Sequence, residues 1–532
     1  MKNLYPYRFT IPENIRRDTL EYRRKLEKFL SEPVSPVAFR AFRVPMGIYE
    51  QRVPGKFMVR IRIPGGRVFP RQLEVIARLS ERYGSGSVHV TTRQDLQLHE
   101  VKIEDTPDVL ETLLEAELSP RGGGGNTVRN VTACPRAGVC PAEEFDVTGC
   151  SIAVSEYLLR DDSSFNLPRK FKINFSGCPA DCALASVADV GFFAHTRNSR
   201  QGFSVYAGGG LGSHSRVGVK IEDFVPLSEV CTVVEGVKRL FDRHGDRTNK
   251  HRARLRYVLN RVGEDAFRRL YHEEKAVGRE VREEDQTFPR GPSAPAMSRG
   301  RIALLHDKLP GRYTVWMELD QGDIPASDLV QVGRLAAEFG EGVVRTAQTQ
   351  DLLISGVPRD KTAQVCAALE KLSVRNPGNG RPRIVSCTGA ATCKLGLCLS
   401  HNLARAIKEE IDTRAMSGAI PGAMPDSSPE ALTGGTPGAQ PEKSPGRDAG
   451  GGWPAGIIRI SGCPNSCGHH RVAWLGFEGK ARRVEGRLMP FYDVLTGARM
   501  KEGDARLAER VGSIPARSVP SFVADLWERG TG

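Results

Sequence analysis

The 532-residue sequence has few cysteines, no long apolar run and no targeting segment at its start. Twelve cysteines are too few for a disulfide scaffold of this length, which favours a reducing compartment. The opening MKNLYPYRFTIPENIRRD has no apolar signal core, and no uninterrupted apolar stretch approaches the ~20 residues needed to span a bilayer. We therefore expect a multidomain protein of the cytoplasm that has no membrane partner.

The sequence also lacks recognisable nucleic-acid, flavin and nicotinamide domains. Its formal net charge is +13, and a field of this sign speeds encounters with any polyanion. The basic residues are nevertheless spread through periodic Leu-rich segments, without a helix-turn-helix, an RNA-binding signature or an arginine-rich tail. We expect no nucleic-acid partner, and we interpret the charge as a basic solvated surface or as the complement of an acidic redox partner.

What the sequence does contain is one cysteine pattern that occurs twice. In each copy a C-x5-C pair is followed, after a long gap, by a C-x3-C pair that follows Ser-Gly and opens Cys-Pro. The C-terminal tetrad is Cys387, Cys393, Cys463 and Cys467, and the N-terminal tetrad is Cys134, Cys140, Cys178 and Cys182. Four thiolates that converge in a reducing cell should hold a metal centre. The recurrence itself predicts an internal duplication.

The duplication extends beyond the cysteines. The stretch that starts at Pro54 aligns without a gap with the stretch that starts at Pro310. Each reads as strand, loop, amphipathic helix and strand, because apolar residues recur at helical spacing in the middle. These helix positions are Leu73, Ile76, Ala77 and Leu79, matched by Leu329, Val332, Leu335 and Ala336. Such units pack helices on one face of a mainly antiparallel sheet, so we predict an α+β fold.

Two stretches rich in Pro, Gly and Ser interrupt the pattern. Residues 286–300 separate the halves and are predicted to be a linker. Residues 416–452 fall between the two pairs of the C-terminal tetrad and lack periodic apolar residues, so we predict a disordered surface insertion. Upstream of it, the stretch from Ala390 to Ile411 is helix-like.

The spacing favours iron over zinc at the cysteine tetrads. Structural zinc sites bring their ligands in as C-x2-C to C-x4-C knuckles on tight turns. A C-x5-C pair is wide for a knuckle and suits the larger span of an iron–sulfur cube. Zinc stays the alternative.

With these motifs in hand, the sequence resembles the siroheme-containing sulfite and nitrite reductases. The resemblance rests on the tetrad and on VTTRQDLQLH at 90–99, GNTVRNV at 125–131 and LPRKFKI at 167–173. It implies that Cys387, Cys393, Cys463 and Cys467 bind a [4Fe-4S] cluster and that Cys467 also bridges to the siroheme iron.

The resemblance also implies the domain organisation. Two tandem homologous halves, related by a pseudo-twofold axis, would each carry a ferredoxin-like half-domain and a siroheme/[4Fe-4S] domain. The expected boundaries are 1–105 and 106–285 for the first half, 286–300 for the linker, and 301–365 and 366–532 for the second half.

The reaction implied by the resemblance is the six-electron reduction of a small oxyanion. A bound anion needs cations around it, which offset the burial of negative charge and polarise the bonds that break. By motif these catalytic cations are Arg93, Arg129, Lys170 and Lys172. Lys170 and Lys172 lie two apart in a strand-like segment, so both project on the same face. Further candidates for siroheme contacts are Arg169, for a carboxylate, and Gln94, Thr127, Asn130 and Asn465, which could equally satisfy backbone groups in turns.

The substrate and the electron donor follow from the same resemblance. Sulfite reductases of the family tend to carry Lys-x-Lys where plant-type nitrite reductases carry Lys-x-Asn, and this chain has Lys172. We therefore predict sulfite as the substrate, with nitrite as the alternative. Electrons would come from another protein, either an acidic ferredoxin or a separate flavoprotein.

The N-terminal tetrad departs from the single-site assimilatory members of the family, whose first half has lost its cysteines. A second [4Fe-4S] cluster and four cysteines kept as buried apolar residues are both open. Lys172 aligns with Ile457 and Arg93 with Thr349, so we predict a single catalytic centre. Two other classes stay open: a precorrin-modifying iron–sulfur enzyme and a non-catalytic electron carrier.

Overall fold

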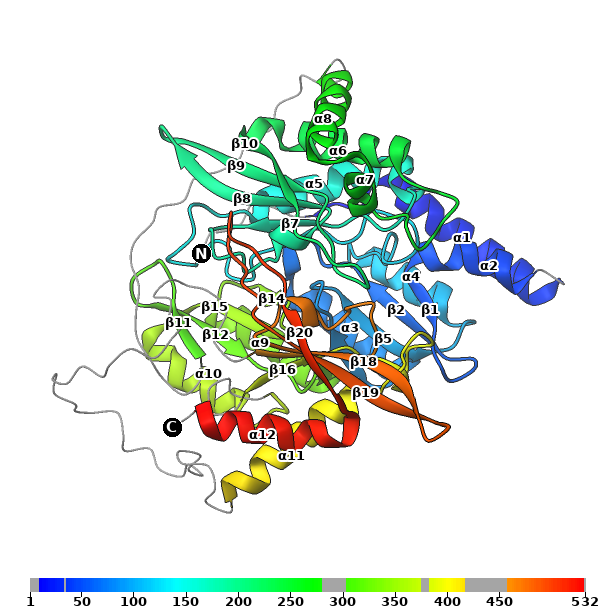
Figure 1. The fold of residues 1–532 in the computed structure, drawn as a ribbon. Helices are drawn as coiled ribbons and strands as arrows, with labels where there is room; N and C mark the ends of the chain where they lie inside the picture. The colour runs from blue at the N-terminus through cyan, green and yellow to red at the C-terminus, as the bar shows by residue number, and fades with distance from the viewer. Residues whose placement is uncertain (1–8, 33–34, 280–302, 375–381, 417–456, 531–532) are drawn as a thin grey trace.

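The computed structural model describes residues 9–32, 35–279, 303–374, 382–416 and 457–530 (Figure 1). The predicted linker at 286–300 and all but the first residue of the predicted insertion at 416–452 lie outside the described residues. None of the described helices is long and apolar enough to cross a bilayer.

The first ferredoxin-like half-domain is an antiparallel sheet covered by helices α3 (Pro70–Tyr83) and α4 (Thr106–Glu115). Val59 and Ile61 lie two apart in the second strand, so they project from the same face of the sheet. They share one buried core with Leu73 and Ile76 of α3. The strands, in sheet order, are β1 (Ile48–Glu50), β2 (Phe57–Ile61), β5 (Leu96–Val101), β4 (Ser87–Val90) and β13 (Asp323–Pro325).

The second half-domain repeats this arrangement under helices α9 (Ala326–Phe339) and α10 (Thr362–Leu369). Its strands, in sheet order, are β11 (Ala303–His306), β12 (Arg312–Met317), β15 (Leu352–Pro358), β14 (Val344–Thr346) and β3 (Arg67–Val68). Each sheet thus ends in a strand from the other half: β13 pairs with β4, and β3 pairs with β14. The two half-domains are therefore interlocked by exchanged edge strands.

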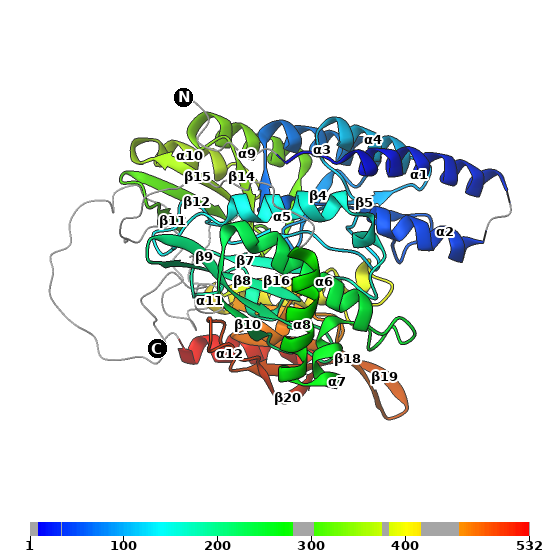
Figure 2. The same ribbon diagram turned by 90° about the horizontal axis from the view of Figure 1, so that it is seen from above.

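The helices of both half-domains form one layer. Figure 2 shows α10, α9, α3 and α4 in a row along one edge of the molecule, followed by α1 (Glu13–Ser31). Helix α9 approaches α3 closely because Gly333 has no side chain, and a Cβ there would lie 3.4 Å from Leu73 Cδ1 and from Pro70 Cα. The predicted repeat and the α+β fold of two homologous halves are confirmed.

Each half continues into a larger domain with a mixed sheet, shown at the top and at the bottom of Figure 1. The first sheet runs β10 (Val219–Pro226), β9 (Arg200–Ala207), β8 (Val190–Arg197), β7 (Ile173–Ser176) and β6 (Thr132–Ala133). Helices α5 (Thr148–Arg160), α6 (Val230–His244), α7 (Leu255–Val262) and α8 (Glu264–Arg279) accompany it. The second runs β16 (Arg383–Ser386), β17 (Ile457–Ser461), β18 (Leu475–Val484), β19 (Arg487–Thr496) and β20 (Glu509–Pro515), with helices α11 (Ser400–Met416) and α12 (Val519–Gly530). In both sheets two neighbouring strand pairs are parallel and two are antiparallel.

Local structure departs from the sequence prediction in three places. The helix expected from Ala390 begins only at Ser400, because the amides of Leu397 and Cys398 donate to Gly462 O and not to the residues four before them. The strand-like segment of LPRKFKI is a single bridge, Phe171 to Val128, and β7 starts only at Ile173. The N-terminal helices α1 and α2 (Pro36–Arg43) were not predicted.

Candidate cofactor and anion site

The C-terminal tetrad gathers at the carboxyl ends of β16 and β17. The Cys387 amide donates to Ile460 O (3.1 Å), which ties the first cysteine to the strand before the second pair. The amide of Gly462 donates to Cys387 Sγ (3.2 Å). Burial raises the pKa of the Cys463 thiol to about 12, and the neighbouring thiols of Cys467, Cys387 and Cys393 contribute to the rise. The four sulfurs therefore lie together, with Cys467 the exposed member.

The tetrad meets the first half of the chain at Cys467. Thr92 Oγ1 donates to the carbonyl oxygen of Cys467 (2.8 Å). Burial lowers the pKa of Lys170 to about 7, and Arg254 lowers it further, while the Cys467 thiol opposes the shift. The pKa of Lys172 falls well below its usual range because of burial and of the positive charges of Arg93 and Lys170. The structure thus brings together groups that are about 300 residues apart in sequence.

The two predicted arginines are held by side-chain and backbone oxygens of the first half. Arg93 donates to Asn174 Oδ1 (2.5 Å), Thr132 Oγ1 (3.3 Å) and Asn130 O (2.6 Å). Arg129 donates to the carbonyl oxygens of Gly123 (2.9 Å) and Gly125 (2.8 Å). Burial lowers the pKa of both guanidinium groups, that of Arg93 to about 10. Neither arginine forms a salt bridge within the described residues, although the buried Asp95 carboxylate lies close enough to both to raise their pKa values against the effect of burial.

The smaller candidates bond to the backbone instead. Gln94 Nε2 donates to Thr346 O (2.7 Å) and its Oε1 accepts from the Ala133 amide (3.0 Å). Thr127 Oγ1 donates to Gly122 O (2.9 Å) and Gly124 O (2.8 Å), while Asn130 Nδ2 donates to Ile63 O (2.8 Å). These contacts favour the structural role that the sequence left open. Two candidates remain more accessible: Arg169, whose Nη1 is 3.4 Å from Asn126 Oδ1, and the exposed Asn465.

The structure adds three basic residues that the sequence prediction missed. Arg254 is buried and pairs with Asp189 (Nη2 to Oδ2, 2.8 Å), beside Lys170 and Lys172. Arg256 lies against the GGGLG loop, and a Cβ at Gly210 would be 2.9 Å from its Nη1. Burial lowers the pKa of Arg62 to about 10. In the sequence, Arg254 and Arg256 are marked only by the run RARLR, and Arg62 by no motif. Such a run does not stand out in a chain with 76 Lys and Arg residues.

The N-terminal tetrad also gathers, on the other side of the pseudo-twofold axis. Cys182 is hydrogen-bonded to Cys134 and Cys178, and Cys140 lies near both of the latter. The remaining cysteines are placed elsewhere: Cys150 on α5, Cys231 on α6, Cys366 on α10, and Cys398 with its thiol 3.4 Å from Lys480 O. Within the described residues, no group of three or more Cys, His, Asp or Glu side chains is arranged to hold a metal ion.

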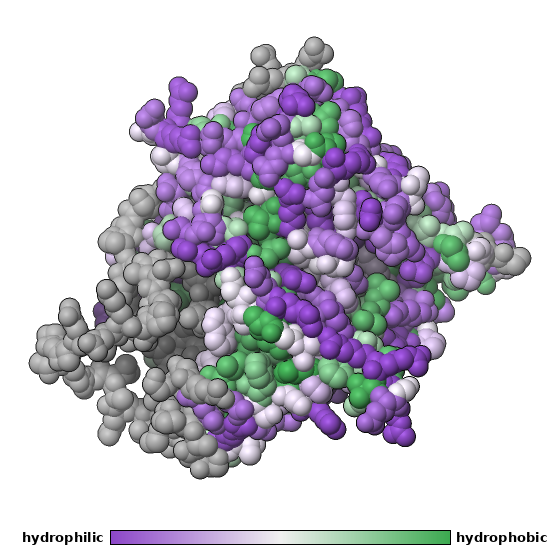
Figure 3. All heavy atoms as spheres, in the orientation of Figure 1, coloured by the Kyte–Doolittle hydropathy of each residue, from purple (hydrophilic) through white to green (hydrophobic). Residues whose placement is uncertain are grey.

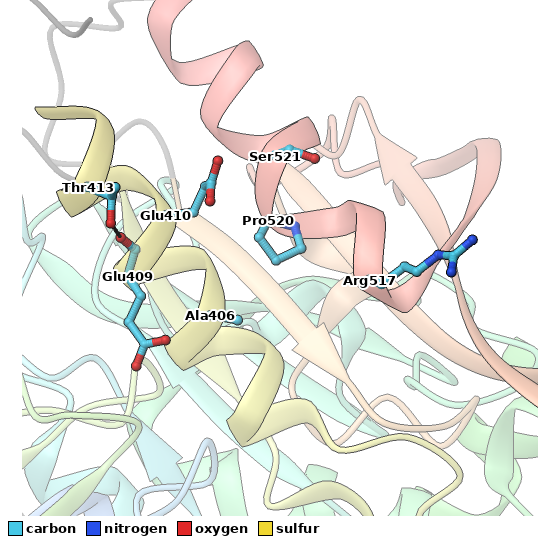
Figure 4. A pocket seen from close by; sticks show the side chains of 7 residues that line it. All are labelled: Ala406, Glu409, Glu410, Thr413, Arg517, Pro520 and Ser521. Carbon is cyan, nitrogen blue, oxygen red and sulfur yellow. Dashed lines mark hydrogen bonds between the residues drawn. The ribbon is translucent and has the colours of Figure 1, made fainter. Parts of the chain in front are cut away.

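The predicted site lies where the two halves meet, and it is not one of the grooves of the outer face. Figure 4 shows a groove of about 410 Å³ between α11 and α12, lined by Glu409, Glu410 and Arg517 among others, and none of the predicted site residues borders it. The face drawn in Figure 3 is mostly hydrophilic, with smaller hydrophobic patches. The site is therefore defined by the cations of the first half and the four thiols of the second half, which the fold brings together.

An anionic cofactor fits this arrangement. Burying several cations together is unfavourable unless negative charge compensates them. Buried nitrogen atoms in this region lack a hydrogen-bond partner within the described part of the chain: Nε of Arg62, Arg93 and Arg129, and Nδ1 of His469. Burial and the positive charges of Arg459, Lys172 and Arg93 lower the pKa of His469, which places this histidine beside the same cations. The four thiols of the C-terminal tetrad supply a donor set suited to an iron–sulfur cluster beside it.

The fold and the site define a class: an α+β redox protein of two homologous halves, with four thiols on one half and a cluster of basic residues on the other. This cluster, the basic bed, consists of Arg93, Arg129, Lys170 and Lys172. Residues 124–279 match the family model "Nitrite and sulphite reductase 4Fe-4S domain", and residues 49–116 and 306–372 match "Nitrite/Sulfite reductase ferredoxin-like half domain". The chain belongs to the nitrite and sulfite reductase family. Its cofactors are siroheme and a [4Fe-4S] cluster.

Individual relatives cover nearly the whole chain. A ferredoxin–nitrite reductase of Synechococcus elongatus is 29% identical, over 96% of this chain and 94% of the relative. A sulfite reductase [ferredoxin] of Mycolicibacterium paratuberculosis is 26% identical, over 82% of this chain and 75% of the relative. The structure of the Mycobacterium tuberculosis NirA protein has the same fold, with a TM-score of 0.77, 21% identity, and coverage of 97% of this chain and 93% of that one.

Proposed function

We propose that this chain reduces sulfite to sulfide. The observation that carries the proposal is the pair Lys170 and Lys172 beside Cys467 and Arg93. Within the described residues neither lysine side chain forms a hydrogen bond or a salt bridge, so both amines are available to a ligand, whose negative charge would favour their ammonium form. Two ammonium groups match the charge of the sulfite dianion better than that of nitrite.

The cofactors fit specific residues of the chain. Cys387, Cys393, Cys463 and Cys467 would hold the [4Fe-4S] cluster, with Cys467 shared with the siroheme iron, while Arg169 and Asn465 would contact the tetrapyrrole. Siroheme and cluster, when bound, supply electrons one at a time to the anion.

The chain itself supplies binding and protons. Conversion of sulfite to sulfide consumes six electrons and six protons and releases the three oxygens as water. Arg93 and Arg129 hold the anion's charge, while Lys170 Nζ and Lys172 Nζ bind its oxygens and pass protons to them as they depart.

An acidic ferredoxin is the proposed electron donor. The relatives of Synechococcus elongatus and Mycolicibacterium paratuberculosis are both named as ferredoxin-dependent, and a net charge of +13 suits an acidic partner. A separate flavoprotein is the alternative.

Nitrite is the second candidate substrate, and one observation favours it. The relative named as a nitrite reductase is more similar than the one named as a sulfite reductase, at 29% against 26% identity. The two anions would use the same arginines and differ in their need for Lys172.

The variant Lys172→Asn tests the substrate. We expect it to keep its siroheme absorbance and to lose about 100-fold in kcat/KM for sulfite, the loss expected when one electrostatic contact to the transition state is removed. The loss for nitrite should be at least several-fold smaller. Lys102→Asn, at an exposed position, is the matched control and should leave both rates unchanged. An unchanged ratio of the two rates in Lys172→Asn would refute sulfite as the preferred substrate.

A further inference from the structure

The two cysteine tetrads are built on the same backbone framework. In each, the amide of the first cysteine donates to the strand that precedes the second pair, and the amide of the second cysteine closes a turn on the residue four before it. A third bond joins the loop after the first pair to the glycine before the second pair. The N-terminal bonds and their C-terminal counterparts are Cys134 N to Phe175 O (2.9 Å) and Cys387 N to Ile460 O (3.1 Å), Cys140 N to Arg136 O (2.9 Å) and Cys393 N to Gly389 O (3.0 Å), and Glu144 N to Gly177 O (2.8 Å) and Leu397 N to Gly462 O (3.0 Å).

The turns after the two C-x3-C pairs share an unusual conformation. Asp181 has a φ of 53° and Leu184 a φ of 57°, and the aligned Ser466 and His469 have φ values of 56° and 63°. A left-handed backbone is unfavourable for residues other than glycine, and most of all for a bulky one such as Leu184. Four such residues at aligned positions show that the first half keeps a strained turn that orients the last two cysteines.

The partner half docks on both tetrads in the same way. The Arg52 amide donates to Thr392 O, next to Cys393, and the Lys308 amide donates to Val139 O, next to Cys140, both at 2.8 Å. Arg52 and Lys308 are equivalent in the repeat, so each half supplies one wall of the other's tetrad. The N-terminal tetrad is therefore enclosed like its counterpart.

The N-terminal thiols face one another. Cys134, Cys140 and Cys178 are 3–5% exposed, and Cys182 is hydrogen-bonded to Cys134 and Cys178. Cysteines kept only as small apolar residues would gain nothing from this arrangement, because a thiol packs equally well against aliphatic side chains.

Among the described residues, this side does not repeat Arg93 and Lys172, whose places are taken by Thr349 and Ile457. Thr349 stands where Arg93 would be required, and its hydroxyl donates to Asp351. The Asp351 carboxylate also pairs with Arg383 and accepts from Trp316 Nε1 (3.1 Å). Arg383 lies 4.7 Å from the centre of the Trp316 ring. A hydroxyl hydrogen-bonded to a carboxylate thus stands where Arg93 stands on the other side.

We propose that Cys134, Cys140, Cys178 and Cys182 bind a second [4Fe-4S] cluster that has no siroheme attached. The inference rests on the family's iron–sulfur chemistry and on the equivalence of the two tetrads, and it holds whichever anion is reduced. The chain would then carry two clusters and one tetrapyrrole.

Metal analysis of the full-length protein, purified without air, tests the proposal. We expect about eight cluster irons and as many acid-labile sulfides for each siroheme. The double variant Cys134→Ser/Cys140→Ser should lose half of the cluster iron and keep the siroheme absorbance of the wild type. Cys150→Ser, at a buried cysteine of α5 outside both tetrads, is the matched control and should keep all of the iron.

Three results would overturn the proposal. The first is a wild-type protein with about four cluster irons per siroheme, and the second is zinc in place of the additional iron. The third is a double variant that keeps both its siroheme and its full iron content. Should the double variant fail to fold and lose both cofactors, the wild-type iron and sulfide count decides alone. An unchanged ratio of the sulfite and nitrite rates in Lys172→Asn would refute the proposed substrate but would say nothing about the iron count of the wild type. The two proposals can therefore fail independently.

Discussion

Removal of the Asp189 carboxylate should destabilise the protein by about 3–5 kcal/mol, the range measured when one partner of a buried ion pair is deleted. The Asp189 side chain is fully buried and that of Arg254 is 6% exposed. The carboxylate accepts from Arg254 Nη2 (2.8 Å) and Nε (3.3 Å), and also from the Lys172 amide (2.9 Å). Asp189→Leu removes all three acceptor contacts and leaves Arg254 charged beside Lys170 and Lys172.

The free energy of unfolding from urea titrations, followed by circular dichroism, measures this effect. The double variant Asp189→Leu/Arg254→Met removes both charges and should recover at least half of the loss, because an apolar pair of similar volume often replaces a buried ion pair without penalty. Glu264→Leu breaks the exposed salt bridge to Arg216 (3.2 Å) and should change stability by no more than about 1 kcal/mol.

The outcome for Asp189 separates two explanations. A single variant within about 1 kcal/mol of the wild type would show that Arg254 does not depend on this carboxylate. A double variant less stable than the single one would show that Arg254 is held by other groups. Either result would refute the claim that Asp189 compensates the basic bed.

Two further predictions concern the thiolate centre and the response to acid. Cys467→Ser should lose the cluster and the siroheme together, seen as loss of the Soret band and of about four irons, and a variant with intact Soret absorption would disprove the shared ligand. Burial lowers the pKa of His99 to about 3 and that of His401 to about 4. Because both stay neutral in the folded protein while the unfolded chain takes up protons below about pH 6.5, stability should fall from pH 6.5 toward pH 4, by up to about 1.4 kcal/mol per pH unit for each histidine. In urea titrations at pH 6.5, 5.5 and 4.5, His99→Gln should reduce the slope of the free energy of unfolding against pH by the contribution of one histidine. An unchanged slope would contradict the assignment.

The sequence predicts the repeated helices well because their signal is long. Apolar residues recur through α3 and α9 at aligned positions, and both helices are 14 residues long in the structure. The exchanged strands β3 and β13 are two and three residues long, too short for any alternation to be read. The interlocking of the two half-domains therefore follows from the three-dimensional structure alone.

The candidate site divides in the same way. Cysteine spacing and LPRKFKI identify groups that the structure brings together, because a motif of several residues is specific even without geometry. Arg62, Arg254 and Arg256 carry no such signal, since a single arginine in a basic chain is indistinguishable from a solvated one. Only burial and the pairing of Arg254 with Asp189 set them apart.

Duplication and charge together explain why one catalytic centre is expected in a chain with two tetrads. The pseudo-twofold fold places each tetrad against the opposite half, so the backbone offers two equivalent sites. The side chains that face them differ. At Cys467 the facing half supplies Arg93 and the lysine pair, whose side chains form no salt bridge within the described residues and have Asp95 and Asp189 as acidic neighbours. On the other side Thr349 stands in place of Arg93 and Asp351 pairs with Arg383, so the cations that face the C-terminal tetrad are not repeated there. We therefore expect the tetrapyrrole at one of the two equivalent positions, while both tetrads offer four thiols to iron and sulfide.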